Sequence, residues 1–413
     1  MSRFHFIAVA VLSLACACLH AAEPPTDFTV DSKPFASAEY ADAHRLWQGI
    51  PSIERSRAGR LFVAWYSGER KEGDRGNYCL LAVSNEQGES WTAPLVVIRG
   101  RAGVRAGEPL PWLDPLGRLW LFWNGFTGAP ETSGTWATVC DAPDAAEWAW
   151  TVPRFISNGI VLGKPIVTRD AAWLAPLDVR NGSPLAKRVG DHVGGVLRST
   201  DQGATWQWQG GFTVPAELDN FDEHCLVERR DGSLWTVLRT NHGLMQSASR
   251  DGGKTWSAPE PFMSNAVTRA CLLRLASGNL LLIYHDGPGR TKGDRTSYAR
   301  RDLTAFLSTD DGKTWKHKLL LDPRDKVSYP DATQGPDGTI YITYDYHRYG
   351  TGCKEILFTS ITEDDIFKKR LPRTPTVVSR ATGYGNHIEL ENADEDTVRE
   401  KVNKELAKPL KGS

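Results

Sequence analysis

The segment Ser308-Thr309-Asp310-Asp311-Gly312-Lys313-Thr314-Trp315 follows the pattern Ser-x-Asp-x-Gly-x-Thr-Trp, which is typical of a tight hairpin turn. In such a turn the Asp carboxylate accepts hydrogen bonds from the turn backbone, Gly takes the positive φ angle, and Trp packs beneath the loop. Three more copies of this octet, called the Asp box below, start at Ser84, Ser199 and Ser249, and the first has Glu86 in place of Asp. Four copies predict a protein built from repeated units.

A second repeat consists of a turn, usually with glycine, followed by a run of apolar, β-branched and aromatic residues, as expected of a strand. It occurs at residues 58–65, 116–123, 231–238, 277–284, 337–344 and, more weakly, 169–176. The first two Asp boxes lie about twice as far apart as the others, so a decayed copy is expected at residues 141–148. A sixth position has only a remnant at 361–365.

Six strand signals and six box positions predict an all-β fold, a six-bladed β-propeller with four-stranded antiparallel blades, over residues 23–380. The glycine-turn runs are expected to be its inner strands, and residues 23–44 to lead in and close the ring. A two-sheet sandwich would not have so long a repeat period. Residues 381–413 are predicted to be a polar tail.

Residues 1–22 are predicted to be a signal peptide, since Arg3, the apolar run 6–19 and Ala21-Ala22 have the order of its three regions. We therefore expect a secreted or periplasmic protein. A lipid anchor at Cys16 is poorly supported by the residues before it. No later stretch is apolar enough to span a membrane.

The remaining composition excludes several classes of function. With 49 basic and 50 acidic side chains and a net charge of −1, the chain has no basic stripe for nucleic acid. We expect a monomer. We also expect no cofactor or metal, because neither metal-ligand spacing nor a phosphate-binding loop is present. Five cysteines outside the predicted signal are widely spaced and are expected to be free buried thiols, at positions 79, 140, 225, 271 and 353.

Three segments carry a resemblance to a known family. They are residues 221–239, which run from Phe221-Asp222-Glu223 to Arg239; residues 299–308, with Arg300-Arg301-Asp302; and Val327-Ser328-Tyr329-Pro330-Asp331. Together with the Asp boxes, they resemble the sialidase (neuraminidase) superfamily over roughly residues 45–367. The resemblance implies a sialidase-like propeller and an exo-acting glycoside hydrolase.

The resemblance also implies catalytic roles. Tyr329 would be the nucleophile, Glu223 its hydrogen-bonded partner, and Asp74 the acid/base residue on a loop. A phenol with a pKa of about 10 is a poor nucleophile, so a carboxylate that takes its proton is needed. A neutral nucleophile avoids repulsion by a substrate carboxylate. A core Tyr, a loop-capping Glu and a solvated Asp are the structural alternatives.

Arginines are implied for the substrate carboxylate, which their planar fork binds through two hydrogen bonds. Arg239 and Arg300 match two of the family's three arginines, with Arg301 as the competitor of Arg300. Both could instead form structural ion pairs. The family's first arginine, in Arg-Ile-Pro, is replaced here by Gly49, and the sequence leaves open whether another arginine compensates; the candidates are Arg45, Arg70 and Arg269.

Three functions remain open from the sequence. The first is a secreted hydrolase that removes a terminal acidic sugar, sialic acid or a related one, with retention of configuration. The second is a polysaccharide lyase that acts on uronate-containing glycans. The third is a glycan-binding propeller without catalysis, which the loss of the arginine at position 49 makes credible.

Overall fold

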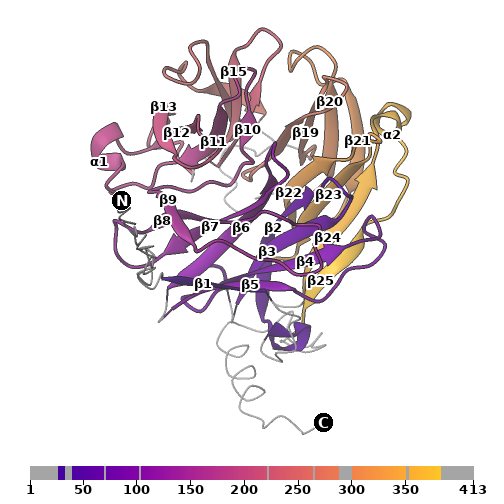
Figure 1. Ribbon diagram of the computed structural model, residues 1–413. Coiled ribbons are helices and arrows are strands. Elements are labelled where there is room, and N and C mark those ends of the chain that lie inside the picture. The colour runs from indigo at the N-terminus through magenta and orange to yellow at the C-terminus, as the bar shows by residue number, and fades with distance from the viewer. Residues whose placement is uncertain are drawn as a thin grey trace, which may run out of the picture.

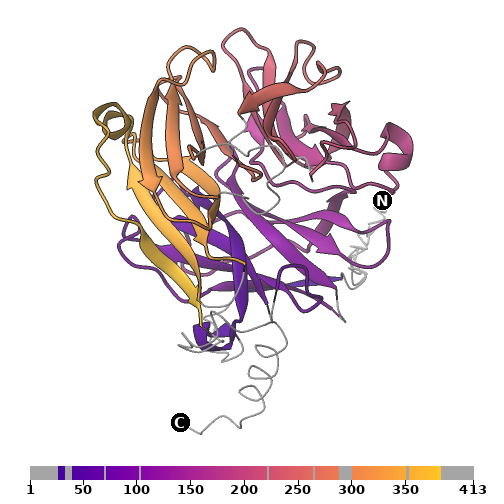
Figure 2. The same ribbon diagram turned by 180° about the vertical axis from the view of Figure 1, so that it is seen from behind.

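Six antiparallel sheets surround a common centre in the computed structural model (Figure 1), which describes residues 27–32, 40–68, 71–101, 104–220, 223–263, 266–287, 300–349 and 353–382. The view from behind shows the same ring of blades (Figure 2). The predicted all-β, six-bladed propeller is confirmed. The predicted signal peptide and almost all of the predicted tail lie outside the described residues and stay predictions. In the described ranges, no helix combines the length and apolarity needed to cross a membrane.

Each blade is made of four consecutive strands that pair in chain order. Blades 1 to 3 contain β2 (Trp47–Arg55), β3 (Leu61–Gly68), β4 (Tyr78–Ser84) and β5 (Val96–Gly100); β6 (Arg105–Leu113), β7 (Leu119–Phe126), β8 (Gly134–Cys140) and β9 (Arg154–Ser157); and β10 (Ile166–Val167), β11 (Trp173–Asp178), β12 (Val193–Ser199) and β13 (Gln207–Thr213).

Blades 4 to 6 contain β14 (His224–Glu228), β15 (Leu234–Thr240), β16 (Gly243–Ser249) and β17 (Glu260–Met263); β18 (Cys271–Arg274), β19 (Leu280–His285), β20 (Leu303–Ser308) and β21 (His317–Asp322); and β22 (Val327–Gln334), β23 (Ile340–Tyr346), β24 (Lys354–Ile361) and β25 (Thr376–Ala381). The helical pieces are η2 (Asp42–His44), α1 (Ala186–Val189) and α2 (Glu363–Lys368).

The second repeat forms the second strand of each blade rather than the innermost one, which corrects the expectation. The innermost strands are β2, β6, β10, β14, β18 and β22, the first strand of each sheet. Prolines and polar residues interrupt several of these strands, so their apolar pattern is weaker than that of the second strands.

The segment before β2 was expected to close the ring. Its first part, β1 (Phe28–Ser32), instead pairs with β5 and becomes the outermost strand of blade 1, whereas Asp42 O of η2 accepts a hydrogen bond from Thr382 N (2.9 Å), just after β25 of blade 6. Hydrogen bonds of β2, from one side chain and from the backbone, also hold the first blade to the last. The Gln48 amide donates to Lys354 O (2.8 Å) and Ser379 O (3.0 Å), and Ile53 N donates to the Asp331 carboxylate (2.9 Å).

Every Asp box forms the turn between the third and fourth strands of its blade. In the box that starts at Ser308, the Asp310 carboxylate accepts hydrogen bonds from Thr314 N (2.8 Å) and Thr314 Oγ1 (2.7 Å). The decayed copy at 141–148 lies at the equivalent turn of blade 2. In blade 6 the turn contains α2, whose first turn is capped by Thr362, so a helix replaces the sixth box.

The box glycines also bring neighbouring blades together. Gly203 has a φ of +83°, and a Cβ there would lie 2.5 Å from the Trp120 ring of the preceding blade. A Cβ at Gly88 would lie 2.1 Å from the Phe358 ring of blade 6, and one at Gly312 would lie 3.2 Å from the Trp235 ring of blade 4. The turn shape that recurs from box to box therefore sets the contact between consecutive blades.

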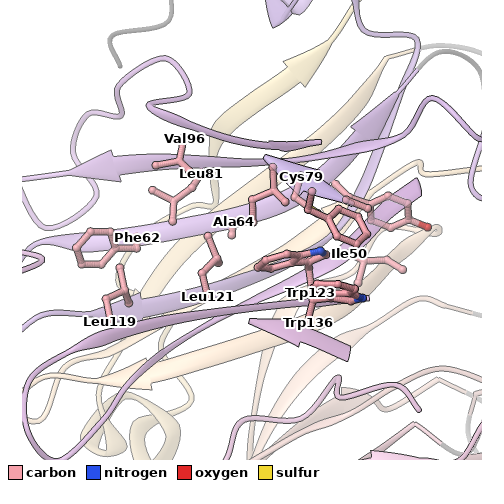
Figure 3. Packing of buried hydrophobic residues seen from close by; sticks show 14 of the residues in the cluster. Ile50, Phe62, Ala64, Cys79, Leu81, Val96, Leu119, Leu121, Trp123 and Trp136 are labelled. Atoms are coloured by element: carbon pink, nitrogen blue, oxygen red, sulfur yellow. The ribbon is translucent and has the colours of Figure 1, made fainter. Parts of the chain in front are cut away.

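Between the blades lies the hydrophobic core. Figure 3 shows Phe62 and Ala64 of β3 beside Leu119 and Leu121 of β7, with Trp123 at the inner end. All five are at most 1% exposed. Burying side chains of this size contributes about 1.5–3 kcal/mol each, so the blade interfaces supply much of the folding free energy.

The Gly203→Ala substitution should destabilise the protein more than Gly338→Ala. Both glycines have nearly the same φ, +83° and +85°, but no atom lies within 4 Å of a Cβ at Gly338. Both variants pay the left-handed backbone cost, about 1–2 kcal/mol, and only Gly203→Ala adds overpacking of about 1–3 kcal/mol. Denaturant unfolding of both measures the difference; equal losses would contradict the close contact with Trp120.

Candidate active site

Three inner strands bulge at the residue that precedes a proline. Ile50, Glu108 and Tyr329 have φ angles of 52°, 54° and 53°, and the pairing register shifts at each of them. Positive φ is rare for bulky residues and costs on the order of 1–3 kcal/mol. Bulges re-aim a side chain, and the contacts of Tyr329 with blade 4 show that its side chain reaches across the axis.

The Tyr329 hydroxyl lies between a carboxylate and a guanidinium. It donates to Glu223 Oε1 (2.8 Å) and accepts from Arg239 Nη1 (2.8 Å). Arg239 Nη1 is also 3.0 Å from Glu223 Oε1. All three residues are buried. The structure therefore brings together the Tyr, the Glu and one arginine that the sequence placed in one site.

Burial raises the pKa of the Tyr329 phenol above its usual value, although the charges of Arg239, Arg348 and Arg300 lower it. The carboxylate of Glu223 also raises it. The phenol is therefore neutral at physiological pH. It can act as a nucleophile only if its proton leaves during attack, and Glu223 Oε1 is the acceptor already bound to it.

Arg300 and Arg301 point to different surroundings. The Arg300 guanidinium carbon is 5.4 Å from the centre of the Tyr329 ring, and its nitrogens donate to Val267 O (3.2 Å) and Ser328 Oγ (3.4 Å). The Arg301 side chain is 45% exposed and pairs with the adjacent Asp302 (3.1 Å). Of the two competitors, Arg300 is the one that lies at Tyr329.

The space above Gly49 is filled by Arg348, from the segment that follows β23. A Cβ at Gly49 would lie 2.2 Å from Arg348 Cδ. The Arg348 guanidinium carbon is 4.2 Å from the centre of the Tyr329 ring, and this side chain is 1% exposed. An arginine at position 49 and one at 348 would occupy the same volume, so here the third guanidinium comes from blade 6.

Of the three compensating arginines that the sequence suggested, the two that the structure describes do not take this place. Arg45 donates to Ser379 Oγ (2.6 Å) and holds blade 1 to blade 6. Arg269 donates to Leu162 O (2.6 Å) and Pro330 O (3.3 Å), while its guanidinium carbon is 5.4 Å from the Tyr329 ring centre. Arg70 lies outside the described residues.

On the loop after β3, Glu72 rather than Asp74 reaches this cluster. The Asp74 carboxylate accepts a hydrogen bond from Lys71 N of its own turn (3.2 Å), and its described contacts include none of the site residues. Glu72 Oε1 is 3.6 Å from Arg348 Nη1. Burial raises the pKa of Glu72. The charge of Arg348 and hydrogen bonds from Tyr349 and Tyr66 lower it by more, so the pKa lies below its usual value.

Glu108 adds a third carboxylate. Its Oε2 accepts a hydrogen bond from Asn124 Nδ2 (2.7 Å). Burial, followed by the charges of Glu223 and Glu72, raises the pKa of Glu108 to about 6. The pKa of Glu108 is thus raised while that of Glu72 is lowered. Carboxylates with pKa values shifted in opposite directions are common in acid/base sites.

Four residues of the site were not predicted from the sequence: Glu72, Glu108, Arg348 and Tyr349. One signal was available: Gly107-Glu108-Pro109 has the same residue-before-proline placement as Ser328-Tyr329-Pro330. The described residues contain no group of three or more His, Cys, Asp or Glu side chains that could hold a metal ion. All five cysteines in the described ranges are free thiols; four are buried and Cys353 is partly exposed.

A ring of Asp-box blades with a tyrosine, a carboxylate and several arginines on its axis is a sialidase-like propeller. The sequence profile of the BNR repeat-like domain family matches residues 59–342. The match covers more than half of the chain, and the chain belongs to this family.

Individual relatives are more distant. A sialidase of Bacteroides fragilis is 27% identical over 279 residues, 62% of this chain but only 47% of that protein. The structure of a Hadza microbial sialidase has a TM-score of 0.58 and 19% identity, over 81% of this chain and 68% of its own. The leech intramolecular trans-sialidase has a TM-score of 0.61 and 15% identity, over 80% and 70%. At these identities the two structures show a shared fold.

A Gly49→Ala substitution should be costly only while Arg348 is present. The added methyl meets the buried Arg348 stem, so we expect a loss of about 1–3 kcal/mol of unfolding free energy. In an Arg348→Ala background the two closest atoms are removed and Asp345 Oδ2, at 3.2 Å, is the nearest that remains, so most of this loss should disappear. A double-mutant cycle by denaturant unfolding measures the coupling; additive effects would contradict the packing of Arg348 over Gly49.

The raised pKa of Glu108 predicts that folding stability falls as the pH rises. The folded state keeps the proton up to about pH 6, whereas the unfolded state loses it near pH 4.3. The raised pKa stabilises the folded protein by about 2 kcal/mol at a pH below the unfolded-state pKa. This stabilisation is lost as the pH rises through the folded-state pKa. The unfolding free energies of wild type and Glu108→Gln, measured from about pH 4 to 7, isolate the contribution of this residue. A difference that does not change with pH would contradict the raised pKa.

Proposed function

We propose that this protein is an exo-acting glycoside hydrolase of sialidase type, which removes a terminal carboxylate-bearing sugar, sialic acid or a related sugar, from glycans. The observation that carries the proposal is the Tyr329 hydroxyl, hydrogen-bonded to both Glu223 and Arg239 at the propeller axis. An ordinary core tyrosine would not need a buried ion pair around its hydroxyl.

In the first step, Tyr329 Oη attacks the anomeric carbon while its proton passes to Glu223 Oε1. The bond between the anomeric carbon and the leaving oxygen breaks, and a proton donor gives that oxygen a proton. In the second step water attacks the anomeric carbon from the side that the leaving group vacated and gives a proton to the residue that protonated the leaving oxygen. The bond between the anomeric carbon and Tyr329 Oη breaks, and Glu223 returns the proton to Tyr329. Two displacements at one carbon give retention of configuration.

The arginines would bind the carboxylate of the sugar. Arg300 and Arg348 lie on the ring of Tyr329, 5.4 Å and 4.2 Å from its centre, and Arg239 lies at its hydroxyl. A neutral tyrosine can approach an anomeric carbon beside a bound carboxylate without charge repulsion. Arg348 supplies the guanidinium that Gly49 cannot.

The family supports the same class of function. The Bacteroides fragilis relative is a sialidase, and several propellers with this fold are sialidases or trans-sialidases. The matched region spans less than half of the first of these proteins, so the assignment to this chain rests on the geometry around Tyr329.

Tyr329→Phe should reduce turnover of a chromogenic aryl sialoside by about 10⁴-fold or more, because the nucleophile and its proton route are both lost. Tyr344→Phe is the matched control: it removes a buried hydroxyl that donates to Asp322 (2.9 Å), in blade 6 but outside the site. Release of the chromophore is measured for both variants. Full activity of Tyr329→Phe would overturn the proposal.

The same assay, extended to a panel of uronate glycans, separates the alternatives. A lyase produces a carbon–carbon double bond and new ultraviolet absorbance. A binding propeller retains glycans on an array without turnover during long incubation. Either result, in the absence of aryl sialoside hydrolysis, would replace the hydrolase assignment.

A further inference from the structure

Arg348 is shared between two carboxylates that differ in how firmly they are held. Asp345 is fully buried, lies 3.5 Å from Arg348 Nε, and accepts hydrogen bonds from Ile50 N (3.0 Å) and Ser328 Oγ (2.6 Å). Glu72 lies 3.6 Å from Arg348 Nη1, on a turn, with its side chain 30% exposed. Asp345 is therefore a fixed partner and Glu72 a replaceable one.

The contact between Glu72 and Arg348 is also incomplete. The distances from Glu72 to Arg348 Nη1 and from Asp345 to Arg348 Nε are both longer than a good hydrogen bond. Arg348 Nε and Nη1 are therefore buried without a hydrogen-bond partner among the described residues. Buried donors in this state cost free energy until an acceptor reaches them. Arg348 Nη2 already donates to Tyr349 Oη (2.9 Å). The Nη1 group beside Glu72 is therefore the donor that an entering carboxylate could engage, through a charge-assisted hydrogen bond shorter than the present contact with Glu72.

We propose that the substrate carboxylate displaces Glu72 from Arg348, and that the released Glu72 becomes the proton donor to the leaving oxygen. Glu72 pairs with Arg348 before substrate binds, and the substrate carboxylate, the group by which the site recognises its substrate, releases Glu72 for catalysis. This inference rests on the proposed hydrolase function and assigns the acid/base role to Glu72 instead of Asp74.

The surroundings of Glu72 favour its protonation once Arg348 is taken. Burial raises the pKa of Glu72, and Arg348 is the largest influence that lowers it. The substrate carboxylate would neutralise that influence and add negative charge near Glu72. The other charged or titratable groups that face Glu72 are Tyr349, Tyr66 and Arg300, which lower its pKa or can donate to it, and the carboxylate of Glu108.

The proton balance closes over one cycle. Protonated Glu72 gives its proton to the glycosidic oxygen as the bond to the anomeric carbon breaks and Tyr329 attacks. In the second half, water attacks the anomeric carbon, its proton goes to the Glu72 carboxylate, and the bond to Tyr329 breaks. The cycle consumes one water and returns Glu72 to its protonated form, until product departure restores the pair with Arg348.

Proton uptake on ligand binding tests the displacement without any turnover. Free N-acetylneuraminic acid and galacturonic acid are the probes, and titration calorimetry in buffers of different ionisation enthalpy measures protons bound. We expect net proton uptake on binding, lost in Glu72→Gln and kept in Glu108→Gln. Binding without uptake, or uptake lost only in Glu108→Gln, would overturn the displacement alone; no binding of either sugar would overturn the hydrolase function with it.

Leaving-group dependence tests the catalytic role. Glu72→Gln should lose about 10²–10⁴-fold in kcat/KM on a sialoside with a sugar leaving group, and far less on one with an activated nitrophenol, which leaves without a proton. Glu131→Gln, an exposed loop substitution, should leave both substrates unchanged. The same split in Asp74→Asn, with Glu72→Gln active on both substrates, would overturn the assignment.

Discussion

Strained residues before prolines, in the innermost strands, are the constraint on which the site depends. Ile50, Glu108 and Tyr329 each combine a positive φ with a pairing bulge, and such strain persists only where its surroundings hold it. Around Tyr329 they do, because its hydroxyl is fixed by Glu223 and Arg239. A regular strand would place these side chains between the blades, and the axis would lose its chemistry.

Buried charges of both signs balance each other along the axis. Below the site, Lys164 Nζ is 3.2 Å from Asp331 and donates to Ala332 O (2.8 Å), which connects blades 3 and 6. At the site, guanidiniums of Arg239, Arg300 and Arg348 surround Tyr329. Removing one partner of such a pair usually costs several kcal/mol, so this arrangement holds both the ring and the reactive groups in place.

Much of the fold could be predicted from the sequence, because its signals are local. A box such as 308–315 forms its own hydrogen bonds within eight residues, and its glycine angle follows from the turn alone. The turn at the sixth position has no such local signal, because α2 stands there in place of a box. The roles of β1 and of the second strands also escaped prediction, because strand order depends on pairing partners that the pattern does not specify.

The site was accessible only in part. The sequence by itself determined the propeller and, through its resemblance, the residues Glu223, Arg239, Arg300 and Tyr329, which lie in segments that one motif can identify. Only the tertiary structure decided that Arg348 fills the space above Gly49 and that Glu72 is the loop carboxylate beside it. The physical reason is that Gly49 and Arg348 are 299 positions apart in the sequence, and a volume shared by two side chains exists only after the first and last blades have met.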